Sequence, residues 1–165
     1  IAFANIAQEA SSLLTLLPGQ SEEGFLERFA YAYLGTPLDG DHEVALYVAG
    51  HTRESDRVFV WSRPAIYVMA GRRPASKHAY MFPLVYGREE AQAQARKELI
   101  LDLQRRLPEY VVLPPAASDR AVRWMGTAAV SVNPFPDLVS FVADNYVREV
   151  ELGGSVIYRL RESAS

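Results

Sequence analysis

The sequence has no cysteine among its 165 residues. This absence excludes disulfides, thiolate metal sites and a cysteine nucleophile. The chain has only three histidines, spaced too widely to suggest a metal site or a Ser-His-Asp triad. Apolar runs are also short, since charged residues or proline interrupt each of them before the roughly 20 apolar residues that a membrane-spanning helix requires. We therefore expect a soluble stretch of chain without thiol or metal chemistry.

The glycine-rich and catalytic motifs of the large enzyme classes are missing as well. No GxGxxG, Walker, HExxH or GxSxG pattern occurs. Acidic residues are too numerous for one carboxylate pair to be singled out as catalytic. The net charge of −3 offers no overall attraction to nucleic acid. We predict no catalytic residue, no metal, no cofactor and no nucleic-acid partner.

The length of the chain fits a single domain, residues 1–165. Its first residue is Ile1, and the basic flank of a signal peptide is missing. We therefore expect a fragment of a longer protein. Helical spacing of apolar residues in Ile1–Leu17 and after Ser21 predicts an N-terminal helical segment, 1–37, followed by an α/β core, 38–165.

The stretch from Arg57 to Leu84 organises the rest of the chain. Its apolar run Val58–Trp61 is typical of a strand buried on both faces. Residues Ser62–Pro64 suit a helix entrance, and a short helix over Ala65–Ala70 would end at Gly71. A second apolar run, Ala79–Phe82, predicts another strand.

Further elements follow from the same patterns. Apolar residues at helical spacing predict a helix around Val44 and a long helix over Gly87–Leu107, and a buried strand follows at Tyr110–Leu113. In the long helix, Arg105 and Arg106 favour the C-terminal end. Its inner stripe would consist of Ala91, Ala95, Leu99, Ile100, Leu103 and Leu107. Pro136 opens a helix, and alternating residues on either side of Gly153 predict an antiparallel hairpin. Residues 116–134 read as a loop or an extra edge element.

A strand, a long helix and a second strand imply a parallel crossover. We therefore predict a three-layer α/β sandwich with a Rossmann-like, mainly parallel sheet built from strands near Val58, Ala79 and Val111. The C-terminal antiparallel hairpin would lie at one edge of this sheet.

Ligands of open α/β sheets bind outside the carboxyl ends of the strands. An aromatic ring there could stack on a sugar, and guanidinium groups could bind a phosphate or a carboxylate. In the alternative interpretation, the aromatic residues belong to the core and the basic residues are solvated or paired with acids. The candidate ligand-binding residues at this edge are Trp61, Arg63, Tyr67, Arg72, Arg73 and Lys77.

The same stretch carries a family resemblance. Its features are a strand ending in Trp61, the segment Pro64-x-Ile66-Tyr67, the turn Ala-Gly-Arg-Arg-Pro-Ala-Ser over 70–76 and the segment Phe-Pro-Leu over 82–84. Together they resemble a block in bacterial polytopic family-C glycosyltransferases, which are dolichyl-phosphate-mannose mannosyltransferase-like. The likeness continues through Glu98–Pro114 and covers about half of the chain.

In that family the block lies in the soluble region after the last membrane helices, and the catalytic carboxylates lie in loops that this sequence does not include. The resemblance thus implies a non-catalytic extracytoplasmic domain of a cell-membrane glycosyltransferase with a lipid-linked sugar donor. Its partners would be the membrane portion of the same chain and the lipid-linked sugar or a glycan acceptor. It also suggests Arg63, Arg72 and Arg73 as contacts for a diphosphate or a lipid headgroup.

Two alternatives stay open from the sequence. A free-standing Rossmann-like enzyme for small molecules would place its active site at the strand ends. A cell-envelope glycan-binding module would need no chemistry at all.

Overall fold

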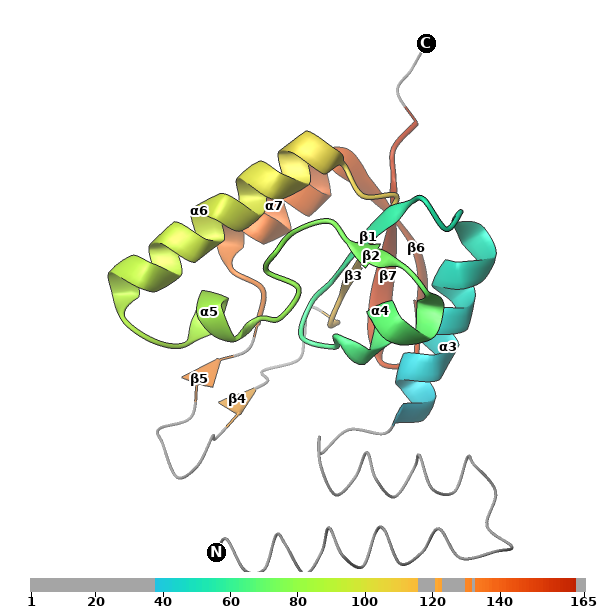
Figure 1. Ribbon diagram of the computed structural model, residues 1–165, viewed down its shortest axis with the longest axis horizontal. Coiled ribbons are helices and arrows are strands. Elements are labelled where there is room, and N and C mark those ends of the chain that lie inside the picture. Colours follow the sequence, from blue (N-terminus) through green and yellow to red (C-terminus); the bar gives the residue numbers. More distant parts are fainter. Residues whose placement is uncertain (1–37, 116–120, 123–129, 132, 163–165) are drawn as a thin grey trace, which may run out of the picture.

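A computed structural model describes residues 38–115, 121–122, 130–131 and 133–162 of the chain (Figure 1). Its centre is a five-stranded sheet with the order β2-β1-β3-β7-β6. The strands β2, β1 and β3 are parallel, whereas β3–β7 and β7–β6 are antiparallel pairs. The bounds are β1 Arg57–Val60, β2 Arg73–Pro74, β3 Tyr110–Leu113, β6 Tyr146–Leu152 and β7 Ser155–Leu160. A separate pair joins β4 (Ala121–Val122) and β5 (Val130–Ser131).

Helices flank both faces of the sheet (Figure 1). The helices α3 (Leu38–His51) and α4 (Ala65–Ala70) cover one face. The other face carries α5 (Phe82–Val85), α6 (Glu89–Arg106) and α7 (Pro136–Asn145). The domain is thus an α/β fold with a mixed sheet between two sets of helices.

Side chains of strand β1 contribute to the hydrophobic clusters on both faces of the sheet. Val58 and Val60 pack toward α3 and α4, while Phe59 packs toward α6 and α7. Successive side chains of a strand point to opposite faces, so an uninterrupted apolar run is what a strand between two helical layers requires. The prediction of a strand buried on both faces is confirmed for β1 and for β3.

Helix α6 confirms the prediction of a long helix, but fewer residues than predicted are buried along its inner face. Ala95, Leu99 and Leu103 are buried, and full burial of each leucine side chain stabilises the fold by about 1.5–3 kcal/mol. Ala91 is exposed although we predicted it on the inner face. The helix ends where Leu107 adopts a left-handed conformation with φ 36° and 44% exposure.

The prediction of a strand at Ala79–Phe82 is wrong. Helix α5 begins at Phe82 with Pro83 in its first turn, a position where proline loses no helical hydrogen bond. The strand that pairs with β1 comes earlier, at Arg73–Pro74. Because β2 lies at the edge of the sheet, Pro74 is tolerated there. With two antiparallel pairs beside two parallel ones, the sheet is mixed rather than mainly parallel.

The other predicted elements in the described residues are confirmed. Helix α4 has the expected bounds and ends at Gly71, whose φ is 61°. The β6–β7 hairpin turns at Gly153-Gly154 and lies at one edge of the sheet, as predicted. The helices predicted within residues 1–37, and most of the loop at 116–134, lie outside the described residues.

Candidate functional site

The two aromatic candidates of the predicted site lie in the core. Trp61 is 2% exposed, and its ring centroid lies 6.0 Å from that of Phe135. Tyr67 is buried on the opposite face of the sheet, where its hydroxyl accepts a 2.8 Å hydrogen bond from the Val60 backbone N–H. Burial raises the pKa of this phenol far above its usual range. This arrangement matches the alternative interpretation, in which both rings are packing groups of the core.

Arg63 closes the carboxyl end of β1. Its Nη1 donates hydrogen bonds to Gly153 O (2.5 Å) and Ser155 Oγ (2.7 Å) at the hairpin turn. Its Nη2 forms an ion pair with Asp41 Oδ1 of α3. Burial raises the pKa of Asp41, and the charge of Arg63 opposes that rise. The guanidinium thus joins three elements of the fold.

Gly40 and Gly153 meet beside this ion pair. A Cβ atom on Gly40 would lie 2.5 Å from Gly153 O, and one on Gly153 would lie within 2.1 Å of Gly40 O. Only glycine allows the two backbones to come so close, and Gly153 also has a φ of 56°. The edge of the sheet predicted to bind a ligand is therefore occupied by contacts between α3, Arg63 and the β6–β7 turn.

The remaining predicted residues are dispersed. Arg72 donates to Thr52 Oγ1 (2.7 Å) and to the backbone oxygens of Ala49 (2.9 Å) and Thr52 (2.8 Å), so it holds the end of α3. Arg73 is exposed on β2. Lys77 lies in the loop that follows, next to α6. The structure does not bring the six candidates together, and their role in binding stays a prediction.

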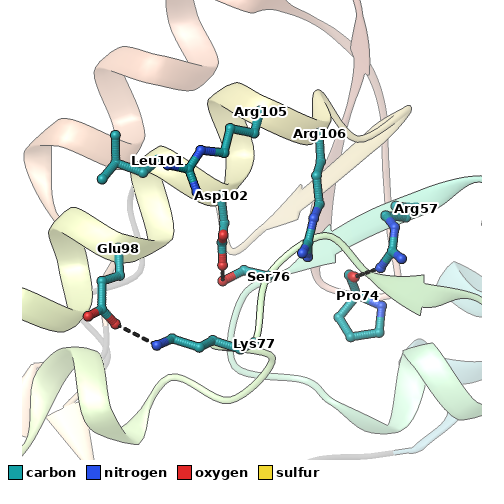
Figure 2. A pocket seen from close by; sticks show the side chains of 9 residues that line it. All are labelled: Arg57, Pro74, Ser76, Lys77, Glu98, Leu101, Asp102, Arg105 and Arg106. Atoms are coloured by element: carbon teal, nitrogen blue, oxygen red, sulfur yellow. Dashed lines mark hydrogen bonds and ion pairs between the residues drawn. The ribbon is translucent and has the colours of Figure 1, made fainter.

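A pocket of about 500 Å³ lies elsewhere, between the loop after β2 and the C-terminal half of α6 (Figure 2). It is at the amino end of β1, opposite to the predicted edge. Its lining combines basic, acidic and small side chains from two stretches of the chain. These residues are Arg57, Pro74, Ser76, Lys77, Glu98, Leu101, Asp102, Arg105 and Arg106.

Two arginines of this pocket are anchored to neighbouring backbone oxygens. Arg57 Nη1 donates to Pro74 O, and Arg106 Nη1 donates to Ala75 O, both at 2.8 Å. Arginine carries five N–H donors, so each guanidinium retains donors for another acceptor. Arg105 is exposed and has no hydrogen-bond or ion-pair partner within the described ranges.

The two carboxylates of the pocket have other partners. Glu98 Oε2 lies 2.9 Å from Lys77 Nζ and 3.1 Å from His78 Nε2. The hydrogen bond from Lys77, with further ones from Gln94 and His78, lowers the pKa of Glu98 to about 2. Ser76 Oγ donates to Asp102 Oδ2 at 2.8 Å (Figure 2). Both acids are thus engaged on the loop side of the pocket.

Of the nine residues that line this pocket, sequence reasoning singled out only Lys77 and missed the other eight. The helix dipole is a sufficient reason for Arg105 and Arg106 near the end of a helix, and Arg57 stands at the start of a strand, so none of the three stands out in the sequence. A signal was present in the helix itself, because residues at i, i+4 and i+8 share one helical face. Glu98, Asp102 and Arg106 have that spacing and form a polar stripe beside the buried one.

A second hollow, of about 570 Å³, lies at the end of α3 and is lined by Gly50, His51, Thr52, Arg53, Asp56 and Glu109. Here the Asp56 carboxylate accepts a 2.7 Å hydrogen bond from the Arg53 backbone N–H and so closes the turn before β1. Within the described ranges no three His, Asp or Glu side chains cluster as metal ligands would. The arginine-lined pocket is therefore the better candidate.

Comparison with known proteins does not show which family the chain belongs to. No family model matches the chain, and no curated protein or solved structure matches it either. In the part of the chain that the structure describes, no helix has the length and hydropathy needed to cross a membrane.

Proposed function

We propose that this chain is a non-catalytic domain of a membrane-bound glycosyltransferase that uses a lipid-linked sugar donor. The domain lies on the extracytoplasmic side of the cell membrane, where it packs against the membrane portion of its own chain. Its task is to bind a ligand of the reaction, either the acceptor or the donor headgroup, while transfer takes place elsewhere in the parent protein.

One observation supports this proposal most strongly. The resemblance to family-C glycosyltransferases is carried by two stretches, 57–84 and 98–114, and every residue that lines the arginine-rich pocket comes from one of them. The two stretches are separated in sequence, yet they meet at the end of α6 (Figure 2). This coincidence supports a binding role for the pocket.

The composition of the pocket agrees with a binding role. It has four basic and two acidic lining side chains, and both acids already have partners. Arginine binds phosphate and carboxylate groups through paired N–H donors. An anionic part of the donor or the acceptor is the ligand that this lining favours.

The finer form of the fold belongs to the same proposal. We infer that the domain is a reduced Rossmann-like, three-layer α/β sandwich. Support comes from the parallel pairing of β1 with β3 across the α6 connection and from helices on both faces.

The complete open reading frame tests the proposal. Several apolar segments of about 20 residues, ending shortly before Ile1, are expected. A short frame without such segments would refute the membrane assignment and would favour a free-standing enzyme. If the segments are found, the full-length protein with Arg105→Gln should lose part of its transfer activity in membranes.

A second candidate function is the binding of cell-envelope glycan. Tyr80 and Tyr86 are 45% and 43% exposed, and their rings lie 5.1 and 6.1 Å from the ring of Phe82. Exposed aromatic faces can stack on sugar rings. A glycan-binding screen of this chain and of its Tyr80→Ala variant tests this function, and a screen without hits would count against it.

A further inference from the structure

We propose that the pocket between the loop after β2 and α6 binds an α-amino acid, with the carboxylate of the ligand at Arg57 and Arg106 and its ammonium group at Asp102 (Figure 2). This inference deepens the function proposed above by naming a class of ligand, and it rests on that function only for the ligand's place in a transfer reaction. The feature that supports it is a pair of opposite charges that the fold holds apart inside one pocket.

The two opposite charges are those of Asp102 and Arg106, four residues apart on α6. An acid followed four residues later by arginine has a favourable spacing for an ion pair on the surface of a helix. In the described part of the chain, however, neither residue has an ion-pair partner. Ser76 Oγ donates to Asp102 Oδ2, and Arg106 Nη1 donates to Ala75 O, both at 2.8 Å. The loop after β2 therefore holds each charge separately.

The loop residues that separate these charges are fixed in the fold. Ala75 and Ser76 are 0% and 1% exposed, and the backbone N–H of Ala75 donates to Val58 O of β1 at 2.9 Å. The side chains of Asp102 and Arg106 are thus held in place before a ligand arrives. A site that is already ordered loses less conformational entropy when it binds.

Two arginines suit the carboxylate of the ligand. Arg57 Nη1 donates to Pro74 O at 2.8 Å, so Arg57 and Arg106 are anchored to the carbonyl groups of adjacent residues. They come from β1 and from the last turn of α6, and both guanidinium groups point toward the loop after β2 (Figure 2). Across the described residues, no carboxylate lies within ion-pair distance of either. Their remaining N–H donors can therefore bind the carboxylate of a ligand.

Asp102 suits the ammonium group of the ligand. Its Oδ2 is used by Ser76, whereas its Oδ1 has no hydrogen-bond partner in the ranges that the structure describes. Asp102 would repel a purely anionic ligand, and Arg106 would repel a purely cationic one. An α-amino acid carries both charges close together, as do two side chains whose Cβ atoms lie about 5–6 Å apart on a helix. The volume of about 500 Å³ leaves room for the side chain of the amino acid.

The test is a titration of the 165-residue chain, followed by its backbone amide NMR signals, with L-alanine, propionate and ethylammonium. Propionate is alanine without the ammonium group, and ethylammonium is alanine without the carboxylate. We expect L-alanine to bind about tenfold more tightly than propionate, the size of one charge-assisted hydrogen bond, and ethylammonium to bind most weakly. The shifted signals should include those of Ala75, Ser76 and Asp102. Equal affinities for L-alanine and propionate, or no shift with any probe, would overturn the proposal.

Variants separate the two ends of the ligand. Arg106→Gln should weaken the binding of both L-alanine and propionate about tenfold. Asp102→Asn should remove the preference for L-alanine and leave propionate binding equal or tighter, a result that a general loss of structure cannot produce. Arg88→Gln is the matched control, because Arg88 is exposed at the other end of α6, about 27 Å from Arg106. Equal affinities of the Arg106 and Arg88 variants for L-alanine, or an unchanged preference in Asp102→Asn, would overturn the proposal.

An amino acid that is joined to a lipid through its side chain presents the same two charged groups. Phosphatidylcholine vesicles with and without phosphatidylserine separate the two sources. Binding to the phosphatidylserine vesicles that is lost in Asp102→Asn supports a lipid-borne amino acid, whereas L-alanine binding without vesicle binding supports a free one. These titrations fail or succeed independently of the open reading frame. A negative titration therefore overturns this inference, whereas a short reading frame overturns the membrane assignment.

Discussion

The substitution Arg63→Gln should destabilise the fold more than any other exchange of a charged residue in the described part of the chain. The side chains of Arg63 and Asp41 are only 12% and 4% exposed. Removing one partner of a buried ion pair leaves the other charge without compensation, at a cost of about 3–5 kcal/mol. Gly153 O and Ser155 Oγ would also lose their donor. Since a domain of this kind is stable by only about 5–15 kcal/mol, the loss is large.

The loss should depend on pH. Burial already raises the pKa of Asp41 above its ordinary value of 3.8, and without Arg63 the pKa should rise further. A carboxyl group whose folded-state pKa is raised stabilises the fold below its unfolded-state pKa and loses that contribution as the pH rises through the folded-state value. The destabilisation by Arg63→Gln should therefore grow between about pH 4 and pH 7.

Urea unfolding followed by circular dichroism measures both effects. The unfolding midpoints can be compared if the slope of the free energy of unfolding against urea concentration is the same in both proteins. Arg73→Gln is the control, because this exposed arginine should change the free energy of unfolding by less than about 0.5 kcal/mol. Asp41→Asn should cost less than Arg63→Gln, since Arg63 keeps its two other acceptors. A loss below about 1 kcal/mol at pH 7, or equal losses at both pH values, would refute the reasoning.

Three further predictions concern the turn, the core and the pocket. Gly153→Ala should destabilise the fold much more than Gly154→Ala in urea unfolding: both residues have positive φ, but only at Gly153 would a Cβ meet the backbone of Gly40. Tyr67→Phe should lower the free energy of unfolding by about 1–3 kcal/mol, because a buried backbone N–H loses its acceptor, and an unchanged value would show that this bond contributes nothing. Glu98→Gln should reduce the loss of stability on acidification from about pH 4.5 toward pH 2. The reason is that a carboxyl group with a lowered pKa stabilises the fold above its unfolded-state pKa, and this contribution is lost as the pH falls. Parallel pH profiles of stability for the two proteins would contradict this prediction.

The main elements were predictable because their signals are local. β1, β3 and α6 follow from continuous apolar runs and from a helical stripe, and the hairpin follows from alternation around Gly153. The error at Ala79–Phe82 has a local cause as well. The apolar run favours a strand, but Pro83 starts a helix as readily as it ends a strand, and here it lies in the first turn of α5.

The site was not predictable in the same way. Whether an arginine is available to a ligand depends on its partners, and these lie far away in sequence. Asp41 neutralises Arg63 across 22 positions, and the backbone oxygens held by Arg72 belong to the end of α3. No periodicity in the sequence indicates such pairings, whereas the polar stripe of α6 could have indicated one wall of the pocket.

The two ends of β1 show why counter-charge is a better guide to a site than charge alone. At the carboxyl end, Arg63 is paired with Asp41 and buried, so a ligand would have to displace part of the fold to reach it. At the amino end, Arg57 and Arg106 are tied only to neutral backbone oxygens and remain open to a pocket. The rule that ligands bind at the carboxyl ends of strands assumes that this edge is open, and here the hairpin turn closes it. The pocket that we propose for binding lies at the opposite edge, where the helix and the loop after β2 leave basic groups without carboxylate partners in the described part of the chain.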